Sequence, residues 1–312
     1  MKEKALCLSE FVLKVVAILA MTLDHLGIFL NGYYPEGSAA YLTGNVFRVI
    51  GRMAFPLFAF MLAEGMRHSH HRGKYLLRLS GMLSAMLVVE AILIYGFQVG
   101  SLQGNPFADL LMGGLTIFLL DFLRKEGKQK WFALLSLLPI AFVGICFGVR
   151  LYEVSHMAPD GSYGIQVVWL PDFLRADYSL FGLLLMLGFY FAYDLGEIFA
   201  KRHASLLGVD VEFFKLQKDY RYLLNLEAML VLLIVTTGFW LLSYAGMDSR
   251  GFRPYDVYGM AYQSWAMLAL PLLLLYSGKR GYDSKGFRWF TYLYFPLHLA
   301  IIFVIFALQF GL

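Results

Sequence analysis

Two polar residues, Asp24 and His25, interrupt the apolar stretch "VVAILAMTLDHLGIF" at residues 15–29. Ionisable side chains inside an apolar helix are costly and normally face a cavity or pair with one another. Histidine changes charge near neutral pH, so His25 is suited to take a proton from an amine or hydroxyl. Neighbouring helical positions diverge by about 100°. Asp24 therefore need not touch His25, and pairing with Arg52 is an equal alternative.

Lys14 lies on the same helical stripe as His25 and precedes it by eleven residues. Eleven residues are close to three turns, which places the two side chains within about 20° of one face and about 16 Å apart. This spacing fits a long, thin ligand with an anionic head, such as an extended pantetheine arm with its thioester near the imidazole. The alternative is that Lys14 extends to the lipid headgroups.

Two further charges fall inside apolar segments, Arg52 in "FRVIGRMAFPLF" and Glu90 in the next segment. We expect them at the same depth as Asp24 and His25, in the outer half of the membrane. Four ionisable groups at one level indicate a polar chamber that opens outward. The alternative is a structural ion-pair cluster that holds the helices together.

The segment "EGMRHSHHRGKYLLRL", residues 64–79, is the main basic feature. Its cations suit phosphate groups, and its tyrosine suits stacking on an adenine. An ordinary cytoplasmic loop that touches anionic lipid is the alternative. The segment also contains three histidines, but no Cys or carboxylate lies at ligand spacing from them, so we predict no metal site. The predicted ligand-binding residues are Arg67, Arg72, Lys74, Tyr75 and Arg78, and the histidines are His68, His70 and His71.

His298 lies in the last apolar segment, "FTYLYFPLHLAIIF", two residues after Pro296. A single histidine in a membrane helix often makes a hydrogen bond to a neighbouring helix. A position lining the channel for an acyl group is the other interpretation.

Composition indicates what must position these residues. The 312 residues are 59% hydrophobic and 15% charged, with a mean hydropathy of +0.63, whereas soluble domains carry about 25% charge. Recurring apolar runs predict an all-α, polytopic transmembrane helix bundle in one domain, residues 1–312. We predict about nine spans, and a tenth crossing within 151–177 stays open. The spans are 11–31, 45–66, 75–97, 107–123, 131–150, 178–200, 222–245, 257–277 and 288–310.

The distribution of charge orients this bundle. With the N-terminus in the cytoplasm, most of the 26 Lys and Arg residues fall in cytoplasmic segments, including Lys2 and Lys4. This asymmetry follows the positive-inside rule and predicts a cytoplasmic N-terminus and an external C-terminus. Cys7 and Cys146 lie far apart and indicate neither a disulfide framework nor a metal site.

The same residues carry a family resemblance. "LKVVAILAMTLDHLGIFL" and "FRVIGRMAFPLFAFMLAEGMRHSHHRGKYLLRL" closely resemble the N-terminal signature of the TraX family, and "DYSLFGLLLMLGFYFA" and "YLYFPLHLAII" resemble its later motifs. The founding member of that family acetylates a conjugative pilin, and the family is grouped with transmembrane acyltransferases. Lys14 and His25 also resemble the basic-x10-His motif of the acyltransferase-three family, in which the histidine is catalytic.

The resemblance implies an acetyl-CoA-dependent acetyltransferase of the bacterial cytoplasmic membrane, with His25 as catalytic base and Asp24 and Arg52 beside it. Acetyl-CoA is then the acyl donor, bound by Lys14, the basic segment and His298. The acceptor is extracytoplasmic: a peptide N-terminus, a saccharide or a lipid-linked glycan. The partners expected are these and the lipid bilayer, with no nucleic acid. The alternatives are a transporter or flippase that uses His25, Asp24, Arg52 and Glu90 for proton coupling or substrate binding, and a membrane scaffold.

Overall fold

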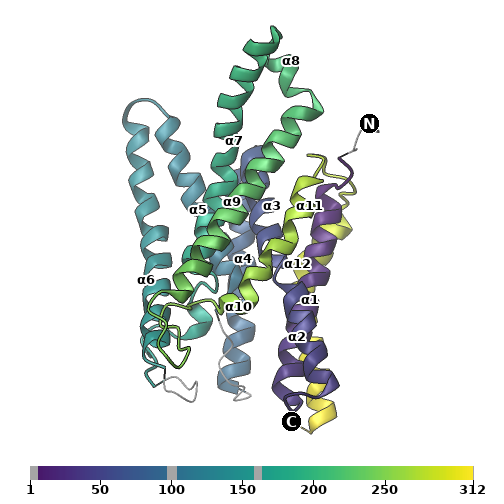
Figure 1. Cartoon of the computed structure of the whole chain (residues 1–312), viewed down its shortest axis with the longest axis vertical. Helices are drawn as coiled ribbons and strands as arrows, with labels where there is room; N and C mark the ends of the chain where they lie inside the picture. The colour runs from purple at the N-terminus through teal and green to yellow at the C-terminus, as the bar shows by residue number, and fades with distance from the viewer. Residues whose placement is uncertain (1–5, 97–103, 158–163, 312) are drawn as a thin grey trace. The chain divides into compact units, whose positions relative to one another are not determined.

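The computed structural model describes residues 6–96, 104–157 and 164–311 (Figure 1). Lys2 and Lys4, counted above among the cytoplasmic cations, lie outside these residues. Within them the regular structure is helical, and strand pairing is limited to two isolated bridges. The main helices are α1 (Glu10–Tyr33), α2 (Ala39–Gly51), α3 (Ala54–His68), α4 (Arg72–Ala91), α5 (Pro106–Leu120), α6 (Leu137–Ser155), α7 (Ser179–Leu207), α8 (Val211–Lys215), α9 (Lys218–Tyr244), α10 (Met260–Gln263), α11 (Leu270–Leu274) and α12 (Lys285–Phe310).

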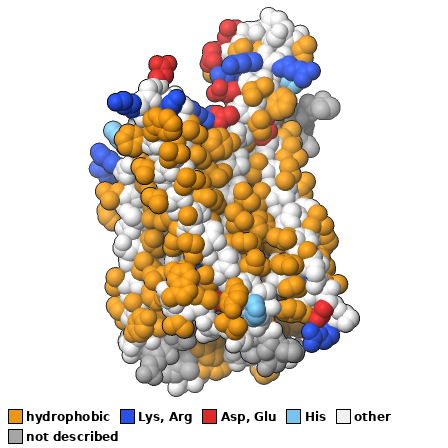
Figure 2. Space-filling view, turned by 90° about the vertical axis from the view of Figure 1, so that its left-hand side faces the viewer, with side chains coloured by type: hydrophobic (Ala, Val, Ile, Leu, Met, Phe, Trp, Pro, Cys, Tyr) orange, Lys and Arg blue, Asp and Glu red, His pale blue; other side chains and the backbone are white. Residues whose placement is uncertain are grey.

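Eight helical stretches of the described chain are long and apolar enough to cross a membrane, which confirms an all-α multi-pass membrane protein. They coincide with eight of the nine predicted spans. Figure 2 shows hydrophobic side chains along the helices of one face, with charged side chains gathered toward the helix ends. The remaining predicted span, 257–277, is a shorter apolar stretch, Met260–Leu274, made of α10, a 3-10 segment and α11. The number of membrane crossings and their orientation stay predictions.

The chain divides into two compact units. The first comprises residues 1–61, 191–233 and 261–312, and the second comprises residues 62–190 and 234–260. The expectation of a single domain over the whole chain stays a prediction.

In the first unit, α1 and α12 run parallel. Near their starts the rings of Phe11 and Phe287 lie 4.8 Å apart, and near their ends the rings of Tyr33 and Phe310 lie 4.9 Å apart. Both helices begin at a serine whose hydroxyl accepts a hydrogen bond from a first-turn N–H, the usual N-cap arrangement. Since aromatic contacts occur at both ends, the middle of α1 faces the middle of α12 along this side.

Helices α1 and α2 approach closely because glycines line their contact. A Cβ atom on Gly27 would lie 2.6 Å from the carbonyl oxygen of Gly44, and a Cβ on Gly51 would collide with the Asp24 side chain. Small residues allow such approach between membrane helices. The helix of the second predicted span breaks after Gly51, and Arg52 stands at the break between α2 and α3.

The short helical stretch of the first unit runs from the α2–α3 break to the start of α1. Gln263 contacts Arg52 at one end, whereas Ser277 N donates to Leu8 O (2.8 Å) at the other. Asn225 Nδ2 donates to two carbonyls at the end of α11, those of Leu274 (2.9 Å) and Tyr276 (2.8 Å). Such side-chain bonds satisfy the backbone of broken helices that are buried in protein.

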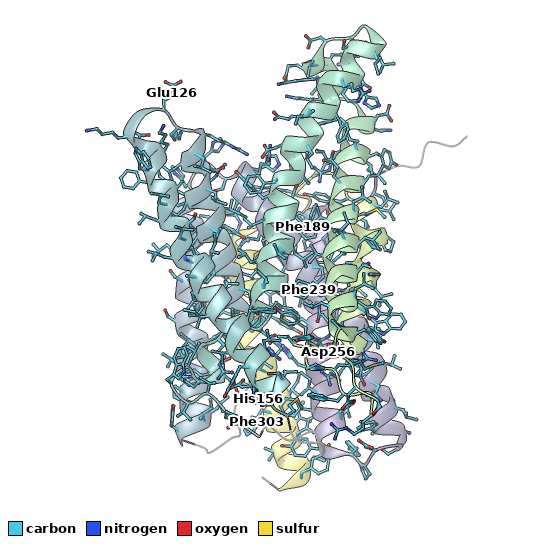
Figure 3. All side chains as sticks on the ribbon, turned by 60° about the vertical axis from the view of Figure 1, so that its left-hand side comes forward. Glu126, His156, Phe189, Phe239, Asp256 and Phe303 are labelled. Atoms are coloured by element: carbon cyan, nitrogen blue, oxygen red, sulfur yellow. The ribbon has the colours of Figure 1, made fainter. Side chains whose placement is uncertain are left out.

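The second unit contains α4, α5 and α6. Its aromatic packing joins elements distant in sequence: Phe239, labelled in Figure 3, lies 5.6 Å from the ring of Phe181 and 5.2 Å from that of Tyr258. The Tyr258 hydroxyl lies 2.8 Å from Ser179 Oγ at the start of α7. This packing gives the unit a core of its own.

Candidate functional site

Asp24 of α1 pairs with Arg52 at the α2–α3 break. The carboxylate is buried, and its second oxygen, Oδ1, has no hydrogen-bond partner in the described structure. Arg52 Nη1 also donates to Gln263 Oε1 at 3.4 Å. The pairing of Asp24 with Arg52, rather than with His25, is therefore one of the two arrangements that the sequence left open.

His25 lies next to His298 of α12. The distance from His25 Nδ1 to His298 Nε2 is 2.7 Å, and the two rings are stacked with centroids 4.9 Å apart. His298 is buried, with 4% of its surface exposed, whereas His25 is half-buried. The structure shows the first interpretation of His298, a hydrogen bond to a neighbouring helix. Its place in an acyl channel stays a prediction.

The hydrogen bonds around this pair define which nitrogen of His25 carries the proton. His298 Nδ1 lies 2.9 Å from the carbonyl oxygen of Tyr294, which only accepts, so Nδ1 donates. With both rings neutral, His298 Nε2 is left as an acceptor and His25 Nδ1–H donates to it. His25 Nε2 is then the deprotonated nitrogen. It has no hydrogen bond within the described residues and is available as a base.

A second hydrogen-bond chain fixes α12 against α1 one turn before the histidines. Thr22 Oγ1 donates to Ile18 O at 2.8 Å and accepts from the Tyr294 hydroxyl at 2.7 Å. The Tyr294 and His298 rings are stacked with an interplanar angle of 5°. The imidazole that contacts His25 is thus held by its own helix and by an aromatic neighbour.

Lys14 is on α1, about three turns before His25. Its ammonium lies 3.4 Å from Glu10 Oε1, an i,i+4 pair at the start of the helix. Both side chains remain partly exposed, so the pair is weak and exchangeable. A role for Lys14 in binding an anionic ligand stays a prediction.

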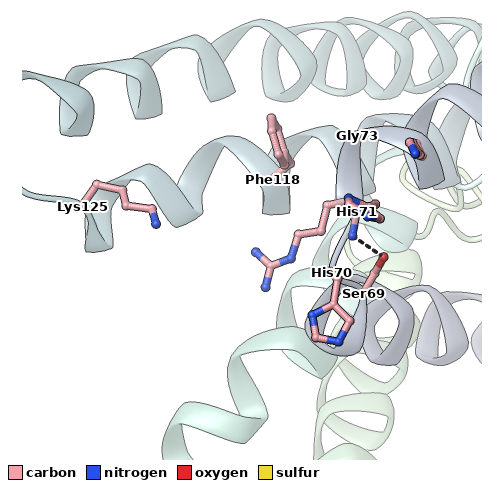
Figure 4. Close-up of a pocket in the computed structure, with 8 residues that line it drawn as sticks. Ser69, His70, His71, Gly73, Phe118 and Lys125 are labelled. Atoms are coloured by element: carbon pink, nitrogen blue, oxygen red, sulfur yellow. Dashed lines mark hydrogen bonds between the residues drawn. The ribbon is translucent and has the colours of Figure 1, made fainter.

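The basic segment of the second unit borders a hollow of about 620 Å³ (Figure 4). Its lining includes Arg72 and Lys74, as the sequence predicts, together with Lys125 and Phe118. Arg72 is also paired with Asp121. Cationic and imidazole side chains around one aromatic ring suit a phosphate-bearing ligand with an apolar part. The other lining residues are Ser69, His70, His71 and Gly73.

The remaining predicted ligand residues lie outside this lining. Arg67 Nη1 donates to the Tyr190 carbonyl at 3.0 Å, and its guanidinium lies 5.5 Å from the centre of that tyrosine ring. The Tyr75 ring lies beside Gly65 of α3, where an added Cβ atom would be 3.5 Å from it. Arg78 is exposed on α4. These three side chains do not converge on the hollow that Arg72 and Lys74 share.

One carboxylate, Glu64, departs from an expectation that the sequence raised, whereas the expectation for Glu90 is not tested. Glu64 Oε2 lies 3.8 Å from His68 Nε2, so a carboxylate one turn away does accompany one of the three histidines. Glu90 is buried in the second unit, where Asn105 Nδ2 donates to it at 3.3 Å. Asp24, His25 and Arg52 belong to the first unit and Glu90 to the second, so the chamber of four ionisable groups stays a prediction.

The sequence did not identify two residues of these sites. Gln263 falls inside a span that we predict to be uninterrupted, although an amide in an apolar run is a usable signal of a polar contact. Lys125 is predicted only as one of the cytoplasmic charges. Neither its distance from the basic segment in the sequence nor its type marks it as a neighbour of Arg72.

The fold and the centre around His25 define a multi-pass α-helical membrane protein with a paired histidine and an ion pair between its helices. The family model described as "TraX protein" matches residues 9–159, which confirms the predicted TraX resemblance. The "Probable fimbrial assembly protein FimC, serogroup H1" of Dichelobacter nodosus is 44% identical over 71 residues. Those residues cover 23% of this chain and 27% of that protein, so the chain matches about a quarter of that relative's length. No solved structure matches the chain.

Proposed function

We propose that this protein is an acetyltransferase of the bacterial cytoplasmic membrane that takes an acetyl group from cytoplasmic acetyl-CoA. The observation that carries the proposal is the hydrogen-bond order from the Tyr294 carbonyl through His298 to His25. That order leaves His25 Nε2 without a proton and directs it away from His298. An unprotonated imidazole held by a second ring is what a general base requires.

In the proposed reaction, His25 Nε2 removes the proton of the acceptor amine or hydroxyl as the acceptor atom attacks the thioester carbonyl. The carbon–sulfur bond breaks, and the CoA thiolate leaves with the proton that His25 releases. His298 accepts from the Nδ1–H of the transient imidazolium and holds the ring in one tautomer. Arg52 donates toward the developing oxyanion or keeps Asp24 in place. Attack of His25 Nε2 itself on the thioester, giving a transient acetyl-histidine, is the alternative route.

The donor has a candidate docking site in the basic hollow. Arg72, Lys74 and Lys125 offer positive charge to phosphates, and Phe118 offers a ring face. Lys14 and His298 are proposed to receive the inner end of the pantetheine and its acyl group. The other three predicted ligand residues keep their proposed roles only if the surrounding segment rearranges on binding, since they do not line the hollow; they are Arg67, Tyr75 and Arg78.

The acceptor is proposed to be extracytoplasmic, as a peptide amine, a saccharide or a lipid-linked glycan. The name of the Dichelobacter nodosus relative, a probable fimbrial assembly protein, favours a fimbrial subunit among these. The TraX resemblance, which implies pilin acetylation, points to the same class of acceptor.

The test is acetyl-CoA binding to the purified protein by calorimetry, together with acetyl-CoA turnover, for wild type and His25→Ala. We expect both to bind and turnover to fall about a hundredfold or more in the variant. A His203→Ala variant is the matched control, since it removes an exposed histidine to which no role is assigned, and it should retain turnover. Folded wild type that binds no acetyl-CoA would refute the acetyltransferase and favour transport.

A further inference from the structure

Arg48 of α2 is a cation in a predicted span to which no role has been assigned. Within the described residues no carboxylate lies within ion-pair distance of its guanidinium, in contrast to Arg52 one turn later. Its Nε atom is buried and has no hydrogen-bond partner. A cation inside a membrane protein that lacks a counter-charge is costly unless a ligand or headgroup supplies one.

The arginine is held in place from two sides. Its guanidinium carbon lies 4.8 Å from the ring centre of Tyr262. Its stem fills the space beside Gly27, where a Cβ atom would come within 2.8 Å of Arg48 Cγ. A cation stacked on an aromatic face and confined along its stem is pre-organised to bind.

The side chains beside Tyr262 are polar and uncharged. The Tyr262 hydroxyl donates to Asn45 Oδ1 at 2.9 Å, and Asn45 lies 2.6 Å from the Asn31 amide. The carboxylate of Glu36 accepts from the Tyr41 hydroxyl at 3.4 Å instead of pairing with Arg48. The niche formed by Arg48, Tyr262, Asn45 and Asn31 therefore offers one positive charge and several amide groups.

This niche adjoins the candidate active centre. Arg48 precedes Arg52 by four residues, or about 6 Å along the helix. Gly27, beside which the Arg48 stem lies, follows Asp24 by three residues and therefore shares its face of α1. An anion bound by Arg48 would lie about one helical turn from the Asp24–Arg52 pair.

We propose that Arg48, stacked on Tyr262, binds an anionic group of the acceptor, a carboxylate or a phosphate. That the anion belongs to the acetyl acceptor rests on the proposed function. That Arg48 binds an anion does not depend on it. Arg48 presents the planar donor pattern that matches either group with two parallel hydrogen bonds. The acetyl acceptor is then an amine or hydroxyl that also carries a negative charge.

The experiment is calorimetric titration of the full chain in neutral detergent with inorganic phosphate and, separately, with acetate, in the absence of acetyl-CoA. We expect wild type to bind at least one of them and Arg48→Gln to bind it about tenfold more weakly or worse. Arg48→Lys keeps the charge and should retain part of the affinity. Equal binding by wild type and a folded Arg48→Gln, or no binding of either anion by wild type, would overturn the proposal.

Arg253 supplies the matched control. Its guanidinium also lies over a tyrosine, 3.9 Å from the ring centre of Tyr244, but Asp256 lies 4.0 Å from it. Arg253→Gln should leave anion binding unchanged. Loss of the same binding event in this variant would mean that any stacked arginine produces it and would contradict the assignment to Arg48.

A lipid headgroup could supply the same phosphate. The titration is therefore repeated in nanodiscs of phosphatidylcholine and of phosphatidylglycerol. Binding that persists in both supports a group of the acceptor. Binding that disappears only in phosphatidylglycerol assigns Arg48 to lipid and overturns the acceptor site. Because acetyl-CoA is absent throughout, failure of the His25→Ala test would refute the proposed chemistry without altering these results.

Discussion

Two arginine–carboxylate pairs, one in each unit, differ in how completely their atoms are bonded. In the second unit Arg175 donates to both oxygens of Glu153, at 2.6 and 3.0 Å, and Val167 N donates to Glu153 at 2.8 Å. Arg175 also donates to the carbonyls of Leu170 and Val167. In the first unit Asp24 keeps one oxygen without a partner, and Gln263, which accepts from Arg52, has an unpartnered amide nitrogen.

The difference indicates different roles. A buried ion pair with every atom bonded is costly to break, because removal of either partner leaves an uncompensated charge. A buried pair with an unbonded oxygen and amide costs stability, and such cost is typical of sites that bind or react. The Glu153–Arg175 pair ties a loop to α6, whereas the Asp24–Arg52 pair stands beside the histidines.

The largest expected effect is on the fully bonded pair. Arg175→Met leaves Glu153 buried without its cation and should lower the free energy of unfolding by about 3–5 kcal/mol. The measurement is an unfolding titration with SDS in mixed micelles. Replacing Glu153 by Met as well should recover part of the loss, since the unpaired charge is then removed. A loss below about 1 kcal/mol in the single variant would contradict a structural role for the Glu153–Arg175 pair.

Asp24→Asn should have a smaller effect on stability, about 1–3 kcal/mol, because one oxygen of Asp24 makes no hydrogen bond to begin with. Its effect on acetyl-CoA turnover should exceed its effect on stability. Turnover and unfolding are measured on the same preparation. If Asp24→Asn reduces stability as strongly as Arg175→Met does, and turnover falls only with the folded fraction, the pair near His25 is structural.

Substitutions of His298 test whether this residue positions His25. His298→Leu removes the acceptor for His25 Nδ1–H and should lower kcat about tenfold or more. KM for acetyl-CoA should rise as well, because His298 is also proposed to receive the acyl end of the pantetheine. His298→Gln keeps an oxygen acceptor near the position of Nε2 and should restore most of kcat. If His298 only packed between the helices, His298→Gln would not restore the kcat that His298→Leu loses. Equal kcat in the two variants would therefore contradict the positioning role.

The sequence limited the partner of Asp24 to His25 or Arg52, because buried charges in apolar helices have few other partners in lipid, and only the structure decides for Arg52. The sequence also predicted eight of the long helices, because each is a long apolar run. It did not predict the broken helix at Met260–Leu274, because hydropathy is the same for a continuous and an interrupted helix. Nor did it join His25 to His298, which are 273 positions apart and meet only through the packing of α12 on α1.

An exposed pair completes the comparison and carries the smallest expected effect. Arg288 donates to both oxygens of Asp283, at 2.6 and 2.8 Å, and this hydrogen bonding, with the nearby charges of Arg280 and Lys14, holds the pKa of Asp283 below its usual value. A carboxyl whose pKa is lower in the folded state stabilises the fold above its unfolded pKa of about 3.9. That contribution is lost as the pH falls through the folded value.

The thermal unfolding midpoint of wild type should therefore exceed that of Asp283→Asn at about pH 6, and the difference should shrink as the pH is lowered toward about 3. Surface pairs contribute about 0–1 kcal/mol, so the shift is small and salt should reduce it further. Repeating the scans at high salt separates this screened pair from Glu153–Arg175, which burial shields from solvent. A difference that stays constant across this pH range would mean that Asp283 acts through its shape and not its charge.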